Sequence, residues 1–306
     1  MKISLSKSLY TKGLQCQKAL WLKKYNKAVL TPPDDATMAR FKEGNTVGDL
    51  ACDLFPGGRE IPFKGTTFSQ KITLTQEWLN EGLNDIYEAT FEYDGVLVMV
   101  DVLHKKSNGS FEIYEVKSST EAKDIFRHDA SIQYYVLNGL GYDVSDVYIT
   151  ILNTDYIRGD ELDVRQLFTH VKVTDDVLAL QGDIPATLGK FRETLTDRVN
   201  EPDIDIGRYC KKPYPCDAID YCWKQQRNIP EYSVFNIFQM NKNPKSVQLY
   251  KDGIVAVEDI PDTMKLTDIQ QHKVAVWKAQ RPVINKDAIK SFIDSISYPI
   301  YHFDFE

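Results

Sequence analysis

The central third of the chain alternates hydrophobic and polar residues at the spacing of half-buried β-strands. Such runs cover residues 86–93, 96–103, 111–116 and 144–152. Short turn-forming segments separate the first three runs, which therefore predict an antiparallel three-stranded meander. The fourth run is rich in β-branched residues and predicts a further strand after an intervening helix.

Hydrophobic residues recur at helical spacing on both sides of these strands. We expect a helical arm over residues 1–30, helices over 34–55 and 75–84, a helix within 127–142 and a long helix over 175–198. A polar, proline-containing linker and short helices follow. The pattern predicts a mixed α/β domain over 1–228 and a linker with a small helical segment over 229–293.

The first turn of the meander sets which residues of its first two strands face each other. Asp94-Gly95 is a strong signal for a two-residue hairpin turn. This turn pairs residues whose numbers sum to 189, so Glu88 should lie across from Asp101. A carboxylate on one strand would then face a carboxylate on the next.

The second turn, around Ser107-Asn108-Gly109, allows two registers. A two-residue turn would place Asp101 opposite Val116. A three-residue turn with Gly109 in the left-handed conformation would place Asp101 opposite Glu115. Because a one-residue slip reverses the face of every side chain, we predict the three-residue turn, which brings the two acids together.

These registers gather Glu88, Asp101, Glu115 and Lys117 on one face of the meander. Hard divalent cations such as Mg²⁺ and Mn²⁺ prefer oxygen ligands. A lysine beside them can orient or deprotonate an attacking water and offset charge in the transition state. The alternative is that the same residues are ordinary solvent-facing charges on a half-buried sheet.

The segment from Asp101 to Glu115-Val116-Lys117 resembles the core of the PD-(D/E)XK nuclease superfamily, in particular its RecB-like branch. The resemblance implies a restriction-endonuclease-like core, a mixed sheet flanked by helices. It implies that Asp101 and Glu115 bind Mg²⁺ or Mn²⁺, that Lys117 is catalytic, and that Gln133 on the following helix joins the site.

This chain departs from the RecB-like pattern at two positions. Leu137 stands where the branch often has a tyrosine, and Tyr134 or Tyr135 is a possible substitute. Gly48 stands where many members have a metal-binding histidine. The metal ligands would then be completed by water or by one of three acids: Glu88, which we favour, Glu43 or Asp49.

Four cysteines form a second candidate site. Cys210, Cys216 and Cys222 follow one another closely, and Cys16 lies near the N-terminus. Four thiolates suit a [4Fe–4S] cluster or a structural zinc ion. One early and three late cysteines around such a core are similar to CRISPR-associated RecB-like exonucleases, which favours the cluster. It would tie the N-terminal arm to the end of the domain, whereas Cys52 is expected to serve only in packing.

Composition is that of an ordinary globular protein, with 42% hydrophobic and 26% charged residues. No apolar run is long enough to span a membrane, and a cytoplasmic location is expected. The net charge is −7, yet residues 1–30 hold seven lysines and no acid. With Tyr10, Trp21 and Tyr25 interleaved, this segment is either a surface that tracks phosphates and stacks bases, or a solvated helix face.

The last residues, 298–306, read as an apolar strand that carries Asp304 and Glu306. They resemble the opening strand of a DnaQ-like, RNase H-like exonuclease domain, in which two acids bind metal. Nearly the whole chain resembles the N-terminal part of an uncharacterised bacterial family that continues into such a domain. We therefore expect residues 294–306 to begin a truncated second domain.

Two functions of different classes remain open. The first is a Mg²⁺- or Mn²⁺-dependent deoxyribonuclease, an exonuclease by resemblance, that acts on single-stranded DNA or duplex ends and carries a structural iron–sulfur cluster. The second is a non-catalytic nucleic-acid-binding module with a structural zinc or iron–sulfur site. Retention of Asp101, Glu115 and Lys117 favours the enzyme.

Overall fold

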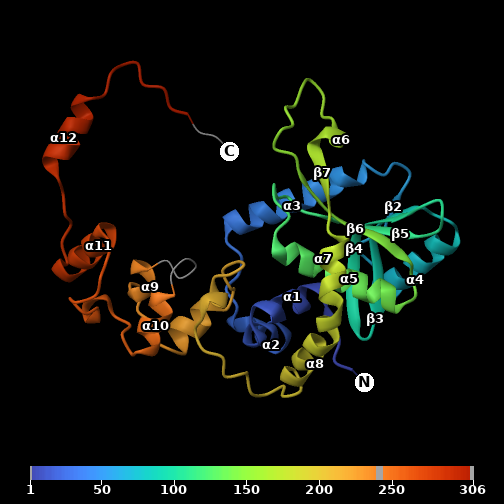
Figure 1. Ribbon diagram of the computed structural model, residues 1–306, viewed down its shortest axis with the longest axis horizontal. Helices are drawn as coiled ribbons and strands as arrows, with labels where there is room; N and C mark the ends of the chain where they lie inside the picture. Colours follow the sequence, from blue (N-terminus) through green and yellow to red (C-terminus); the bar gives the residue numbers. More distant parts are fainter. Residues whose placement is uncertain (1, 239–243, 304–306) are drawn as a thin grey trace. The chain divides into compact units, whose positions relative to one another are not determined.

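The computed structural model describes residues 2–238 and 244–303. The chain divides into two compact units, Met1–Gln226 and Arg227–Glu306. The first unit is a seven-stranded mixed sheet flanked by helices, so the predicted α/β fold class is confirmed (Figure 1).

The strand order in the sheet is β2-β3-β4-β5-β6-β7, and β1 pairs with β4. The bounds are β1 Leu5–Ser6, β2 Arg59–Glu60, β3 Asp85–Tyr93, β4 Val96–Lys105, β5 Phe111–Val116, β6 Val144–Leu152 and β7 Phe168–Lys172.

The helices of the first unit are α1 Lys7–Gln15, α2 Gln17–Tyr25, α3 Asp35–Cys52, α4 Phe68–Asn80, α5 Asp124–Gly139, α6 Val164–Leu167, α7 Thr174–Leu180 and α8 Ile184–Thr194. Short 3₁₀ turns cover Lys27–Val29, Gln181–Asp183 and Arg208–Cys210, and a π-helix covers Asp220–Gln225.

Both predicted hairpin registers are confirmed. β3 and β4 pair with Tyr87 opposite Val102, and β4 and β5 pair with Val102 opposite Tyr114. Gly109 has φ +88°, the left-handed conformation that the three-residue turn requires. Turn chemistry therefore determined the alignment of the acids, as expected from the sequence.

One edge of β4 is shared by two strands that approach from opposite ends. β1 runs parallel to β4 and covers Val96 and Leu97, whereas antiparallel β5 covers residues 102–105. The carboxyl ends of β1 and β5 therefore point toward each other across the interval that contains Asp101. The residues that follow β1 and the last residues of β5 are therefore close together beside Asp101.

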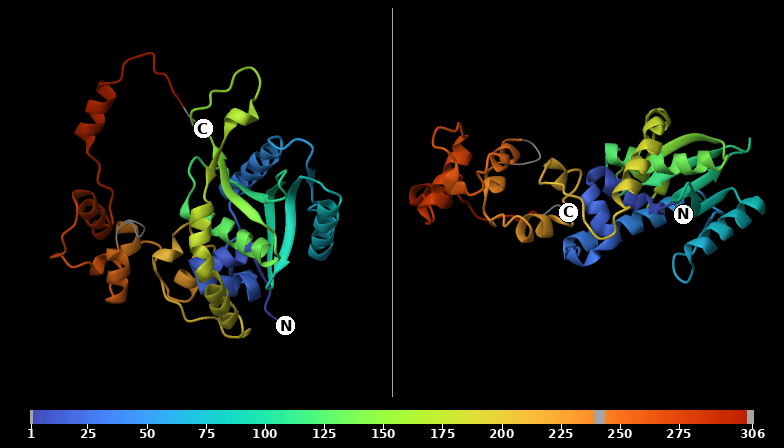
Figure 2. Two further views of the ribbon diagram at one scale, coloured as in Figure 1. Left: turned by 45° about the vertical axis from the view of Figure 1, so that its right-hand side comes forward. Right: turned by 90° about the horizontal axis from the view of Figure 1, so that it is seen from below.

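Helix α5 packs against β3, β4, β5 and β6, and it crosses over between the parallel strands β5 and β6. Helices α1 and α2 both contact α8, as the turned views in Figure 2 show. The hydrophobic core lies among the sheet and these helices, and it includes Leu20, Val100, Ile132 and Phe191. This packing fixes the start of α1 next to the shared edge of β4.

Two predicted helices differ from the structure. The long helix over 175–198 is wrong, because a 3₁₀ turn at Gln181–Asp183 separates α7 from α8. Gly182 has low helical propensity, and Pro185 sits in the first turn of α8, where its missing N–H costs nothing. The helix expected at 75–84 instead begins at Phe68, with Thr67 and Gln70 forming a capping box.

The second unit contains the short helices α10 Lys245–Lys251, α11 Asp268–Ala279 and α12 Lys286–Asp294, as predicted, with a 3₁₀ turn at Val257–Asp259. It also contains α9 Val234–Ile237, which lies in the segment expected to be a linker. Residues 298–303 are not in a strand, and Asp304 and Glu306 lie outside the described residues. Their assignment to a second metal site stays a prediction. Within 2–238 and 244–303, no helix is long and apolar enough to cross a membrane.

Gly13 gives a direct test of how α1 is seated. A Cβ atom at this position would lie 2.7 Å from ring atoms of the buried Phe191 on α8. Gly13→Ala should therefore lower the free energy of unfolding by about 1–3 kcal/mol through overpacking.

Gly48→Ala is the matched control, since its added methyl group meets no atom within 4 Å in the middle of α3. It should raise the free energy of unfolding by about 0.5–1 kcal/mol. Urea unfolding measures both variants. If the two substitutions had the same effect, the close packing of α1 against α8 would be contradicted.

Candidate functional site

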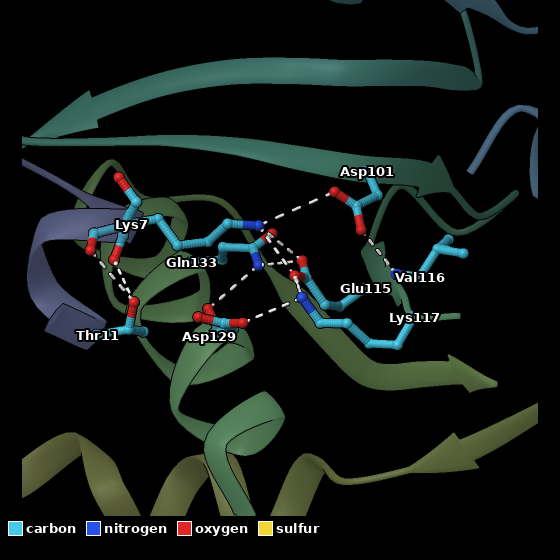
Figure 3. A network of polar contacts seen from close by, with 9 residues as sticks. Lys7, Thr11, Asp101, Glu115, Val116, Lys117, Asp129 and Gln133 are labelled. Atoms are coloured by element: carbon cyan, nitrogen blue, oxygen red, sulfur yellow. Dashed lines mark hydrogen bonds and ion pairs between the residues drawn. The ribbon is translucent and has the colours of Figure 1, made fainter. Parts of the chain in front are cut away.

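Glu115, the next-to-last residue of β5, is the centre of a buried polar network (Figure 3). Its side chain is 0% exposed. One carboxylate oxygen lies 2.6 Å from the ammonium nitrogen of Lys117, and the Gln133 amide donates to the other. The ammonium nitrogen of Lys7 lies 3.0 Å from each of the two oxygens. An uncompensated carboxylate at this depth would be very unfavourable, so its partners are required.

Asp101 borders the same network at the point where β4 passes from β1 to β5. Its Oδ2 accepts a hydrogen bond of 2.7 Å from the Val116 backbone N–H, and its Oδ1 lies 3.9 Å from Lys7 Nζ. The structure therefore brings Asp101, Glu115 and Lys117 together, as the registers predicted.

Helix α5 contributes two residues one turn apart. Gln133 is fully buried, and Asp129 accepts a 3.0 Å hydrogen bond from Lys117. The Gln133 amide nitrogen also donates to the Asp129 carbonyl, whereas its side-chain oxygen is buried without a hydrogen-bond partner. Gln133 is thus held against Glu115 by its amide nitrogen, and its Oε1 can still accept a hydrogen bond.

Glu88 lies between Tyr87 and Ala89, whose partners on β4 are Val102 and Val100. Its φ of +55° is in the left-handed region, which a glutamate adopts only at a cost. Burial and the neighbouring Asp101 carboxylate raise the pKa of Glu88 to about 7. Glu88, the predicted third acid, is therefore next to the network. Its backbone is strained, and its ionised form is disfavoured at this position.

The ionisation of the other groups follows from the same crowding. Burial and Glu115 raise the pKa of Asp101 to about 6. Although burial opposes ionisation, Lys117 and Lys7 hold the pKa of Glu115 down to about 2. Burial lowers the pKa of Lys117, but the neighbouring Glu115 carboxylate raises it by more, so the pKa of Lys117 lies above its usual value. At neutral pH Lys117 is a cation in this structure.

Two residues of the network, Lys7 and Asp129, were not identified from the sequence. Asp129 precedes Gln133 by four positions, so helical spacing could have placed both on one face of α5. Lys7 had no local signal, because it reaches the site only through the pairing of β1 with β4.

The other candidate residues from the sequence lie outside this network. Leu137 is buried in the core, and the Tyr135 hydroxyl lies 3.4 Å from an Asp94 carboxylate oxygen. Glu43 and Asp49, the alternative acids, are exposed on α3.

The N-terminal aromatic residues do not form a base-stacking surface, so that prediction is wrong. Tyr10 and Trp21 are buried, and Trp21 donates to the Asp197 carbonyl. Two lysines among them pair with acids far along the chain, Lys12 with Asp217 and Lys18 with Glu201. The alternation of lysine and aromatic residues reflects helices with one buried and one charged side.

The four predicted cluster cysteines, Cys16, Cys210, Cys216 and Cys222, line one cavity together with Trp223. Burial raises the pKa of the Cys16 thiol, and that of Cys216 to about 12. Within the described part of the chain, no three His, Cys, Asp or Glu side chains are close enough together to hold a metal ion, either here or around Glu115.

No family model and no curated protein matches this sequence. Solved structures similar to the chain include an alkaline exonuclease from Laribacter hongkongensis, with a TM-score of 0.36, 9% identity, and coverage of 63% of this chain and 89% of that one. The same exonuclease in complex with dAMP has a TM-score of 0.35 and 11% identity, and the match covers 63% of this chain and 89% of that one. SSO0001 has a TM-score of 0.23 and 13% identity, and the match covers 59% of this chain and 78% of that one. Likeness at this level does not transfer an activity.

The raised pKa of Glu88 predicts how stability depends on pH. Its ordinary pKa of 4.5 applies to the unfolded chain, whereas the folded value is about 7. The folded state therefore binds more protons between these values, and its stability falls as the pH rises through this window. Glu88→Gln should remove that loss. In EDTA, the variant's stability relative to the parent should increase by about 1–3 kcal/mol between pH 5 and pH 8.

Glu92→Gln is the matched control, since Glu92 lies on the same strand but is exposed. Urea unfolding across the pH range is the measurement. Parallel pH profiles for the parent protein and Glu88→Gln would contradict the placement of Glu88 beside Asp101.

Proposed function

We propose that this protein is a metal-dependent nuclease that hydrolyses phosphodiester bonds of DNA. The observation that carries the proposal is the convergence of Asp101, Glu115, Lys117 and Gln133 where β5 ends. These residue types occur in the order that the PD-(D/E)XK resemblance implies. Burial and neighbouring carboxylates raise the pKa of Asp101 to about 6 and that of Glu88 to about 7, and perturbed acids of this kind cluster at functional sites.

Carboxylate oxygens are the ligand type that a hard divalent cation such as Mg²⁺ or Mn²⁺ prefers. Asp101 and Glu115 would hold it, with Glu88 as a further acid. Burial and the neighbouring carboxylates raise the pKa values of Asp101 and Glu88, and a bound cation would offset the negative charge that causes part of this rise. When bound, such an ion activates water and stabilises negative charge on a phosphate.

The chain's own groups have distinct roles in this proposal. Lys117, kept protonated by Glu115 and Asp129, supplies a fixed positive charge for the developing negative charge on the phosphate. Gln133 holds the Glu115 carboxylate from the side of α5. Asp101 is oriented by the Val116 N–H. An exonucleolytic mode on single strands or duplex ends follows from the resemblance to RecB-like exonucleases.

Lys117→Ala tests the activity. Purified protein should cleave labelled single- or double-stranded DNA with Mn²⁺ and not with EDTA, and Lys117→Ala should lower the rate by about 10²-fold or more. Lys123→Ala, at an exposed lysine six residues away, should keep the parent rate.

Undiminished cleavage by Lys117→Ala would refute this site. If the parent protein binds DNA but does not cleave it with any divalent metal, the chain is instead the non-catalytic nucleic-acid-binding module.

We further propose that Cys16, Cys210, Cys216 and Cys222 hold a [4Fe–4S] cluster, with Zn²⁺ as the alternative occupant. Their shared cavity supports this, since it brings together thiols nearly two hundred positions apart in the sequence. The cavity lies where polar contacts already tie the two ends of the unit, for example from Gln15 to the Tyr209 carbonyl. A cluster would strengthen that closure.

Anaerobic purification tests the cluster. The protein should be brown and contain iron and sulfide, and Cys16→Ser should lose the colour and melt at a lower temperature. Cys52→Ser should keep the colour, because Cys52 lies on α3, outside that cavity. A colourless protein with one tightly bound zinc would refute the cluster but keep the site.

A further inference from the structure

The side chain of Lys7 occupies the space between the two carboxylates proposed to share a metal ion. Its ammonium nitrogen is 3.0 Å from both Glu115 oxygens and 3.9 Å from Asp101 Oδ1 (Figure 3). It therefore bridges the two acids as a monovalent cation. Because Glu115 is fully buried, its carboxylate is not hydrated, and the ammonium group of Lys7 compensates for that lost hydration.

Lys117 differs from Lys7 in how it is held. Lys117 bonds one Glu115 oxygen and is also fixed by Asp129 on α5. Lys117 therefore keeps these two partners if the second Glu115 oxygen exchanges Lys7 for another cation. The Lys7 ammonium group contacts Glu115 and Asp101, the same two acids that a metal ion would use.

The backbone around Lys7 restricts what can move. Ser6 pairs with Leu97 on β4, and its hydroxyl accepts a hydrogen bond from the Leu9 N–H to cap α1. The start of α1 is thus fixed on both sides. The four-carbon stem of a lysine is flexible, and the Lys7 side chain is 22% exposed, so a change of rotamer would move the ammonium group away while the start of α1 stays in place.

A divalent ion and this ammonium group exclude each other. Carboxylate oxygens bind Mg²⁺ or Ca²⁺ at roughly 2.0–2.6 Å, and an ion bound to both acids would lie at the position that the ammonium group bridges. Their like charges would also repel strongly at such a short separation.

We infer that Lys7 is a resident counter-cation, which neutralises the metal-free site and competes with the divalent ion for Glu115 and Asp101. The inference rests on the proposed metal-dependent function and adds a regulatory element to it. Lys7 stabilises the fold before the metal binds and weakens metal affinity, so the site loads only when the ion concentration is high enough to displace it.

Lys7→Met tests the inference, because it keeps the unbranched side chain up to the ε position and removes the charged ammonium group. Isothermal titration of the full chain with Mn²⁺, without DNA, should show affinity at least about tenfold higher than that of the parent protein. The metal-free variant should melt at a lower temperature, and Mn²⁺ should raise its melting temperature more than it raises that of the parent. Lys7→Arg keeps the charge and should keep the weaker affinity.

Lys12→Met is the matched control, since Lys12 is on the same helix but pairs with Asp217. It should bind Mn²⁺ like the parent protein. If Lys7→Met does not fold, Lys7→Gln replaces it in the same titration.

Equal or weaker Mn²⁺ affinity in the uncharged variants Lys7→Met and Lys7→Gln would overturn the competition, even if Mn²⁺-dependent DNA cleavage is observed in the parent protein. Absence of Mn²⁺ binding in the parent and in every variant would overturn both this inference and the proposed nuclease. The two failures are therefore distinguishable.

Discussion

The candidate site depends on one constraint of the sheet: two strands share one edge of β4 and point at each other. β1 covers the beginning of β4, β5 covers its end, and neither can extend without colliding with the other. The chain must leave the sheet on both sides of the interval, so α1 begins at Lys7 and β5 ends beside Lys117. Backbone pairing alone thus places two lysines and two acids within one small volume.

Two of the acids gathered there oppose folding when they are ionised. Asp101 and Glu88 are acids whose ionised forms are disfavoured at this location, and Glu88 also has left-handed backbone. A protein selected only for stability would replace such a cluster with apolar residues at little cost or even with a gain. Strain and unfavourable charge at one place are typical of functional sites, where stability is reduced in favour of chemistry.

Much of this could be predicted from the sequence because it is decided locally. Asp94-Gly95 and Gly109 determine two hairpins, and the hairpins align Glu88, Asp101 and Glu115 through covalent geometry and turn preference.

The errors and omissions involve distant partners. Lys7 reaches the site through a two-residue strand too short to recognise from its sequence, and Trp21 is buried by helices encoded nearly 170 residues later. A side chain's burial depends on what covers it, which local periodicity does not contain.

The packing of α1 against α8 determines when the candidate site can form during synthesis of the chain. Lys7 and its helix leave the ribosome well before Phe191 on α8, which packs against Gly13, and before Tyr209, whose carbonyl accepts a hydrogen bond from Gln15. Contacts of such long sequence separation form late and slowly. The nascent chain therefore carries the hairpin of acids well before it can hold α1 against them, and the complete constellation exists only after the first unit is fully synthesised.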